Sequence, residues 1–175
     1  MAEKNQTPGA GEAKVPGPSG NTRTIQVVEF LLGKEHYAID LFDVREVVEY
    51  TTITKLPNTP PFVKGIIDLR GEVTMILDLK ERLGLPPTEN TEVENTRVIV
   101  LDDTKTSSKI GILVDDVLSV SHFEQEHIDK VSISDSAKES AIRGIIKKKV
   151  QIRNKETSVL IIWIDILPLL QDIGI

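Results

Sequence analysis

The stretch from Pro60 to Leu79 constrains the fold more than any other part of the chain. It holds two apolar runs, Ile66–Leu69 and Val73–Leu79, on either side of the pair Arg70-Gly71. β-Branched and aliphatic residues bounded by glycine are typical of paired strands. Gly71 supplies the positive φ that a tight connection can require. The stretch therefore predicts a β-hairpin with Arg70 at its bend.

Arg70 is a charged residue among side chains that belong in a core. A guanidinium that leaves water needs a carboxylate or carbonyl partner, because burying an unpaired charge is costly. A turn arginine that simply faces solvent fits the same sequence. The hairpin alone leaves both interpretations open.

Composition narrows the class of protein. The 175 residues suffice for one ordinary domain or two small ones. The formal net charge of -6 argues against nucleic acid as the main partner, and the lack of cysteine excludes disulfides and thiol chemistry. No apolar run reaches the roughly 18 residues that span a bilayer, and the N-terminus lacks a signal-peptide core. We therefore expect a cytoplasmic protein that does not insert into a membrane.

The N-terminal segment differs from the rest of the chain. Residues 1–23 are rich in Gly, Pro, Ala and Ser and have no apolar periodicity. Such a segment cannot bury enough surface to offset the entropy lost on ordering. It predicts a disordered tail, with the folded region at residues 24–175.

The folded region opens with two predicted strands, Thr24–Leu32 and His36–Leu41, in a hairpin. Asp43–Glu49 is predicted to be a short helix, because Asp43 is a good N-cap and three valines fall on one helical face. Those valines are Val44, Val47 and Val48. A short strand is expected at Thr51–Leu56, and further helical turns at Lys80–Leu85, Glu124–Asp129 and from Asp165 to about Asp172.

The two halves of the folded region resemble each other. Ile39–Val44 matches Ile112–Val117, and Gly65-Ile66-Ile67 matches Gly144-Ile145-Ile146. Met75–Leu79 likewise matches Ile162–Ile166. The matches keep their order while the offset grows, as insertions in loops would produce. We interpret this as two copies of one unit of about five strands, each a small closed barrel, since closure removes exposed edges. The approximate copies are residues 24–90 and 91–175, with a possible exchange of terminal elements.

The sequence carries no recognisable catalytic motif. The histidines are separate in sequence, and His122 and His127 are five residues apart, which suits one helical face poorly. No glycine-rich phosphate loop follows a strand, and no Ser-His-Asp set or carboxylate pair stands out. The basic run Lys147-Lys148-Lys149 is typical of a solvated strand face. We expect no enzyme activity, no cofactor and no metal.

A possible interaction element remains at Val44–Glu49 and Arg70. Glu46 lies between the valines of the predicted helix and would face Arg70 if that helix packs over the hairpin. A partly desolvated Arg–carboxylate pair can act as a specificity element in an interface. A surface pair worth only about 0–1 kcal/mol is the alternative, and it stays open.

At this point several motifs together resemble the CheW family of chemotaxis coupling proteins. The similarity covers roughly Thr24 to Asp172 and includes a Leu-Arg-Gly turn with an upstream glycine, its most specific part. The motifs are Asp43–Val47, Pro57–Gly71, Ile76–Leu79, Gly111–Val117 and Ile164–Ile166.

The resemblance implies a mainly β fold of two packed SH3-like five-stranded barrels, with short helices and a C-terminal helix. It implies two partners, a CheA-type histidine kinase and methyl-accepting chemotaxis receptors, which the protein would bind at receptor arrays. The protein itself is expected to be a monomer. It places Val44, Glu46 and Val47 at or beside the receptor-contacting groove. Gly65, Arg70 and Gly71 belong to the segment on which coupling depends, with Arg70 paired to Glu46. Kinase contacts would lie on the first barrel.

Two positions depart from the family pattern, and two other functions stay open. Asp68 stands where the family usually has Asn, which adds a carboxylate near Arg70, and Met75 stands where Pro is frequent. One alternative is a scaffold or regulatory domain of another two-component pathway. The other is an SH3- or OB-like barrel that binds single-stranded nucleic acid, which would show salt-dependent binding.

Overall fold

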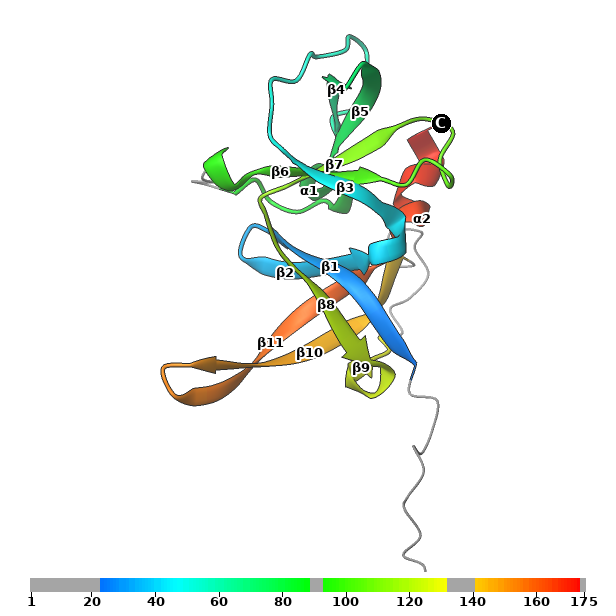
Figure 1. Ribbon diagram of the computed structural model, residues 1–175. Coiled ribbons are helices and arrows are strands. Elements are labelled where there is room, and N and C mark those ends of the chain that lie inside the picture. The colour runs from blue at the N-terminus through cyan, green and yellow to red at the C-terminus, as the bar shows by residue number, and fades with distance from the viewer. Residues whose placement is uncertain (1–22, 89–92, 132–140, 174–175) are drawn as a thin grey trace, which may run out of the picture.

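Residues 23–88, 93–131 and 141–173 are described in a computed structural model (Figure 1). The predicted tail and most of the loop after Val131 lie outside these residues. The strands are β1 (Thr24–Leu32), β2 (Glu35–Asp40), β3 (Val44–Glu49), β4 (Val63–Leu69), β5 (Glu72–Asp78), β6 (Arg97–Leu101), β7 (Ile110–Val114), β8 (Asp116–Glu124), β9 (Ile128–Asp129), β10 (Ile142–Ile152) and β11 (Lys155–Ile164). The helices are α1 (Leu79–Leu83) and α2 (Ile166–Leu170), with 3-10 turns η1 (Leu41–Asp43), η2 (Val93–Asn95), η3 (Gln125–His127) and η5 (Gln171–Ile173).

The strands form two sheets, which confirms the predicted mainly β class. The six-stranded sheet has the order β8-β1-β2-β11-β10-β9, and the five-stranded sheet has the order β3-β6-β7-β5-β4. Figure 1 shows the five-stranded sheet above the six-stranded one. Each sheet takes strands from both sides of residue 90, so the sheets are not consecutive halves of the chain. Division into two domains and closure of each sheet into a barrel stay predictions.

Three hydrophobic clusters cover the faces of the two sheets. This burial explains why many strands are unbroken apolar runs in the sequence. The largest lies between the sheets and takes Phe30 and Ile39 from one, and Ile99 and Ile112 from the other. A smaller cluster around Ile161 covers the other face of the six-stranded sheet. A third, Ile67, Ile76, Val98 and Val100, covers the other face of the five-stranded sheet. Strands buried on both faces need no polar alternation.

Both short α-helices lie close to the predicted helical turns. α1 begins one residue before and ends two residues before the predicted Lys80–Leu85, and α2 begins directly after Asp165, with η5 continuing to Ile173. The Asp78 carboxylate accepts from the backbone N–H groups of Lys80 (2.9 Å) and Glu81 (3.3 Å), and Gly84 ends α1 in the left-handed conformation at φ 70°. The Asp165 carboxylate accepts from the N–H of Leu167 at 3.1 Å and so caps α2. In each case the residue after a strand satisfies the first free N–H groups of a helix.

Other local predictions are wrong. Asp43–Glu49 is not a helix: Asp43 ends the 3-10 turn η1, and Val44–Glu49 is the strand β3 paired with β6. β-Branched valines fit a strand better than a helix, and a partner strand distant in sequence decided the outcome. Glu124–Asp129 is also no α-helix, since η3 and the two-residue strand β9 occupy it. Of Thr51–Leu56, only Thr54 forms a β-bridge, to Ile66.

Candidate protein-interaction site

The Arg70-Gly71 bend is a two-residue turn in which both residues have positive φ. Leu69 pairs with Glu72 across the turn, Arg70 has φ 54° and Gly71 has φ 83°. This is the backbone of a type I′ hairpin, whose twist matches that of the strands. The Asp68 carboxylate accepts from the N–H of Gly71 at 2.7 Å. The added carboxylate of this chain therefore stabilises the turn.

Arg70 forms a bidentate ion pair with Glu46. Its Nη2 lies 2.8 Å from Glu46 Oε2, and its Nη1 donates to Glu46 Oε1 at 3.1 Å. The expected contact is confirmed, although Glu46 is on a strand and not on a helix. Arg70 is 75% exposed and Glu46 is 23% exposed, so the pair contributes about 0–1 kcal/mol to folding. Because β3 and β4 are opposite end strands of their sheet, the pair fixes the hairpin tip against the far end strand.

The valines of β3 do not share one surface. A register shift between Val44 and Glu46 interrupts the strand alternation. Val44 packs against the cluster between the sheets, whereas Val48 packs against the small cluster of the five-stranded sheet. Val47 keeps 40% of its surface exposed. Of the predicted valines, Val47 is the one most available to a partner.

Gly65 is buried and faces backbone instead of solvent. Its φ is +143°, and a Cβ at this position would lie 2.1 Å from the carbonyl oxygen of Thr54. Thr54 and Ile66 exchange two backbone hydrogen bonds of 2.9 Å and 2.8 Å. Gly65 thus permits a loop to pack on the hairpin, and any effect on coupling would pass through the backbone. Gly71 differs, since its Cβ would meet no atom within 4 Å.

Two features at the start of β3 were missed in the sequence. Phe42 in η1 is 73% exposed, an unusual exposure for an aromatic ring. Asp43 is buried and forms an ion pair with Lys105, while Arg45 Nη1 lies 2.9 Å from Asp103 Oδ2. The start of β3 is therefore fixed to the β6–β7 turn. A large apolar residue beside a predicted cap was the available signal for Phe42.

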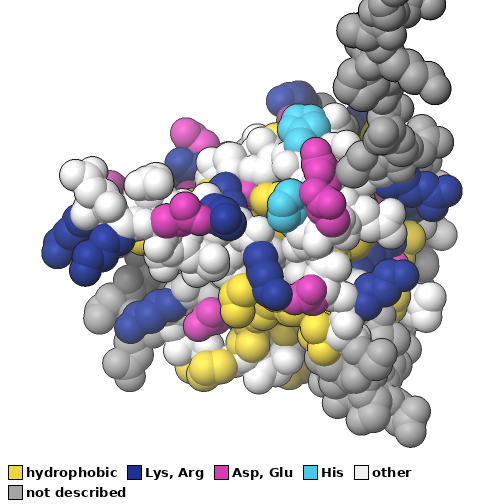
Figure 2. All heavy atoms as spheres, turned by 90° about the horizontal axis from the view of Figure 1, so that it is seen from below, with side chains coloured by type: hydrophobic (Ala, Val, Ile, Leu, Met, Phe, Trp, Pro, Cys, Tyr) yellow, Lys and Arg dark blue, Asp and Glu magenta, His cyan; other side chains and the backbone are white. Residues whose placement is uncertain are grey.

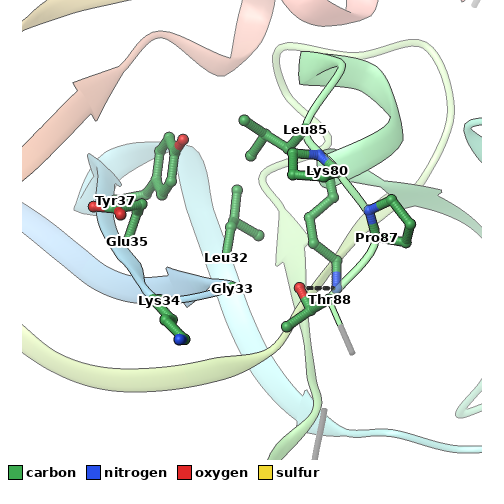
Figure 3. Close-up of a pocket in the computed structure, with 10 residues that line it drawn as sticks. Leu32, Gly33, Lys34, Glu35, Tyr37, Lys80, Leu85, Pro87 and Thr88 are labelled. Atoms are coloured by element: carbon green, nitrogen blue, oxygen red, sulfur yellow. Dashed lines mark hydrogen bonds between the residues drawn. The ribbon is translucent and has the colours of Figure 1, made fainter. Parts of the chain in front are cut away.

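A separate cavity of about 540 Å³ lies between the β1–β2 turn and the segment after α1 (Figure 3). Lys80 Nζ lies 2.7 Å from Asp115 Oδ1, and Asp115 Oδ2 accepts from the N–H of Gly33 at 2.6 Å. Burial raises the pKa of the Tyr37 hydroxyl above its ordinary value, and the Glu35 carboxylate adds to the effect. Lys80 and Asp115 are thus paired with each other beside this cavity. None of the predicted site residues lines it.

Comparison with known proteins now settles the family. A family model described as "CheW-like domain" matches residues 26–174, most of the chain. The chain belongs to the CheW-like family. The resemblance expected from the motifs is confirmed.

Relatives of this CheW-like chain include proteins from distant bacteria. A chemotaxis protein CheW of Klebsiella aerogenes is 37% identical over 119 residues, which cover 68% of this chain and 69% of that protein. One from Thermotoga maritima is 27% identical over 87% of this chain and 92% of its own length. The crystal structure of scaffolding protein TtCheW from Thermoanaerobacter tengcongensis superposes with a TM-score of 0.68 at 32% identity, covering 87% of this chain and 97% of that one. Within the described residues, no helix is long and apolar enough to cross a membrane.

Proposed function

We propose that this CheW-like protein is a non-catalytic chemotaxis adaptor that binds methyl-accepting chemoreceptors and a CheA-type histidine kinase and joins them in one cytoplasmic array. The bidentate Glu46–Arg70 pair, together with the exposed Phe42 and Val47 in the same η1–β3 segment, carries the proposal. Val44, Glu46, Val47, Gly65, Arg70 and Gly71 are the residues proposed to bind partners or to shape the binding surface. The names of its chemotaxis and scaffolding relatives support the same function.

The composition of the η1–β3 segment suits a protein partner. Phe42 and Val47 offer exposed apolar area, and aromatic residues and arginine are enriched where interfaces bind most strongly. Arg70 extends into solvent with Glu46 holding two of its donors, so its conformation is restricted before a partner arrives. Preorganisation of this kind lowers the entropic cost of binding.

Separate binding titrations with each partner test the proposal. The purified chain should bind a soluble receptor signalling fragment and, independently, the regulatory domain of a CheA-type kinase. We expect Arg70→Ala to weaken the receptor interaction by at least tenfold because it removes an exposed guanidinium at the proposed interface.

Arg153→Ala is the matched control. Arg153 also occupies the first position of a two-residue hairpin turn with positive φ (48°), but on the other sheet. The Arg153→Ala variant should bind both partners as the unaltered chain does. Failure of the unaltered chain to bind either partner would refute the adaptor function, and equal losses in both variants would refute the role of Arg70.

A further inference from the structure

An imidazole and two carboxylates meet on the six-stranded sheet, away from the Glu46–Arg70 pair. Glu124, Glu126 and His127 each place a ligand-type atom so that all three atoms lie within 4.8 Å of one another. The spacing of His122 and His127 gave no reason to expect this, because the set contains one histidine and two glutamates. On the face shown in Figure 2, histidine side chains (cyan) lie next to acidic ones (magenta). We propose that Glu124, Glu126 and His127 form a zinc site.

The backbone that carries these ligands is held on both sides. Glu124 ends β8 and pairs with Thr24 of β1, while Ile128 begins β9 and pairs with Ile146 of β10. Between them, the N–H of Gln125 donates to the carbonyl oxygen of Arg23 at 3.1 Å. The turn is therefore fixed before any ion binds. Only side-chain torsions of three exposed residues have to adjust.

The amount of adjustment is small. Zinc bonds nitrogen and carboxylate oxygen at about 2.0–2.2 Å, so the ligand atoms of a tetrahedral site stand about 3.4 Å apart. The ligand atoms already lie within 4.8 Å of one another on exposed side chains, so each separation has to shorten by at most about 1.4 Å. The Glu124 side chain makes no capping hydrogen bond to η3, so its carboxylate is available.

Nearby lysines do not neutralise the two glutamates. Three lysines of β10 line a shallow hollow together with His122, Glu124 and His127. Each is ion-paired with a carboxylate outside the ligand set: Lys147 with Asp129, Lys148 with Glu29, and Lys149 with Glu156. Within the described part of the chain, Glu124 and Glu126 form no ion pair, so their negative charge is left to attract a cation.

The donor set selects the ion. One imidazole nitrogen with two carboxylate oxygens suits zinc, with water completing four-fold coordination. Calcium and magnesium prefer oxygen ligands alone, so the imidazole nitrogen of His127 favours zinc over both. His122 is outside the ligand set, and its ring nitrogen Nε2 is hydrogen-bonded to the Gln26 side-chain amide nitrogen at 2.8 Å.

Calorimetric titration of the full, untagged, EDTA-treated chain with ZnCl₂ tests the site. We expect one zinc ion per chain and no saturable binding of Mg²⁺. His127→Ala should weaken zinc binding at least tenfold, and Glu126→Gln should weaken it in the same direction. His122→Ala is the matched control, because it removes the other histidine of the same hollow, and should bind as the unaltered chain does.

Three results would overturn the assignment: no stoichiometric zinc binding, unchanged affinity in His127→Ala and Glu126→Gln, or an equal loss in His122→Ala. Thermal unfolding in EDTA should be the same for all four chains, since the altered side chains are exposed. None of these results depends on the adaptor function, because no kinase or receptor is present.

Discussion

Replacing Gly65 by alanine would place a methyl carbon 2.1 Å from the carbonyl oxygen of Thr54. Ordinary contacts of a Cβ lie at 3.4–4 Å, so one of the two backbone segments must move. Both are fixed, Gly65 in the β4–β5 hairpin and Thr54 by its bridge to Ile66. The Ile53 side chain, whose Cγ2 would lie at 2.8 Å, can rotate, but the carbonyl group of Thr54 is backbone and cannot.

The cost has two parts. An L-residue at φ +143° is strained by about 1–3 kcal/mol. Moving the loop also breaks the two Thr54–Ile66 hydrogen bonds, each worth about 0.5–1.5 kcal/mol. We therefore expect Gly65→Ala to lower the free energy of unfolding by about 2–6 kcal/mol.

Urea unfolding followed by the fluorescence of the single tryptophan, Trp163, measures this loss. Gly71→Ala is the control, since Gly71 also has positive φ but open space around its Cβ position. That variant should lose only about 1–2 kcal/mol, the left-handed penalty alone. A loss in Gly65→Ala no larger than in Gly71→Ala would show that the close approach of Thr54 is not what requires glycine.

Three further expectations concern stability. Arg70→Ala should change the free energy of unfolding by less than about 1 kcal/mol, as Arg153→Ala does, because its ion pair is exposed; a larger loss in urea titrations would make Arg70 a structural residue. Phe30→Ala empties a fully buried site and should cost about 3–5 kcal/mol by the same method, and a loss below about 1 kcal/mol would contradict the shared core. The raised pKa of Tyr37 means that its hydroxyl ionises more readily in the unfolded chain, so stability falls as pH rises through about 10. Tyr37→Phe should reduce that fall in urea midpoints measured below and above pH 10, and an unchanged fall would contradict it.

Local chemistry was the part of the fold that the sequence predicted well. The helix start at Asp165, the glycine that ends α1 and the Arg70-Gly71 turn all depend on residues within a few positions. Such features are decided by backbone geometry and nearby hydrogen bonds. The Glu46–Arg70 contact was expected chiefly from the family resemblance.

Local sequence patterns could not predict which strands pair when the two strands are far apart in the chain. Val44–Glu49 satisfies the spacing of a helix face, but its partner β6 lies about fifty residues further on. The parallel pairings of β2 with β11 and of β5 with β7 distribute the strands between the sheets, and no local signal marks them. The need for glycine at position 65 likewise arises only once Thr54 is in place. Exposure of Phe42 follows from where η1 lies, not from its neighbours in sequence.

The rate of kinase autophosphorylation in a mixture of receptor fragment, CheA-type kinase and this chain tests the adaptor function most directly. Without this chain, the receptor fragment should change the autophosphorylation rate of the kinase very little. Adding the chain should make that rate respond to the receptor fragment. Arg153→Ala should restore this response in full, whereas Arg70→Ala should not. A kinase rate that is the same with and without the unaltered chain would contradict the adaptor function.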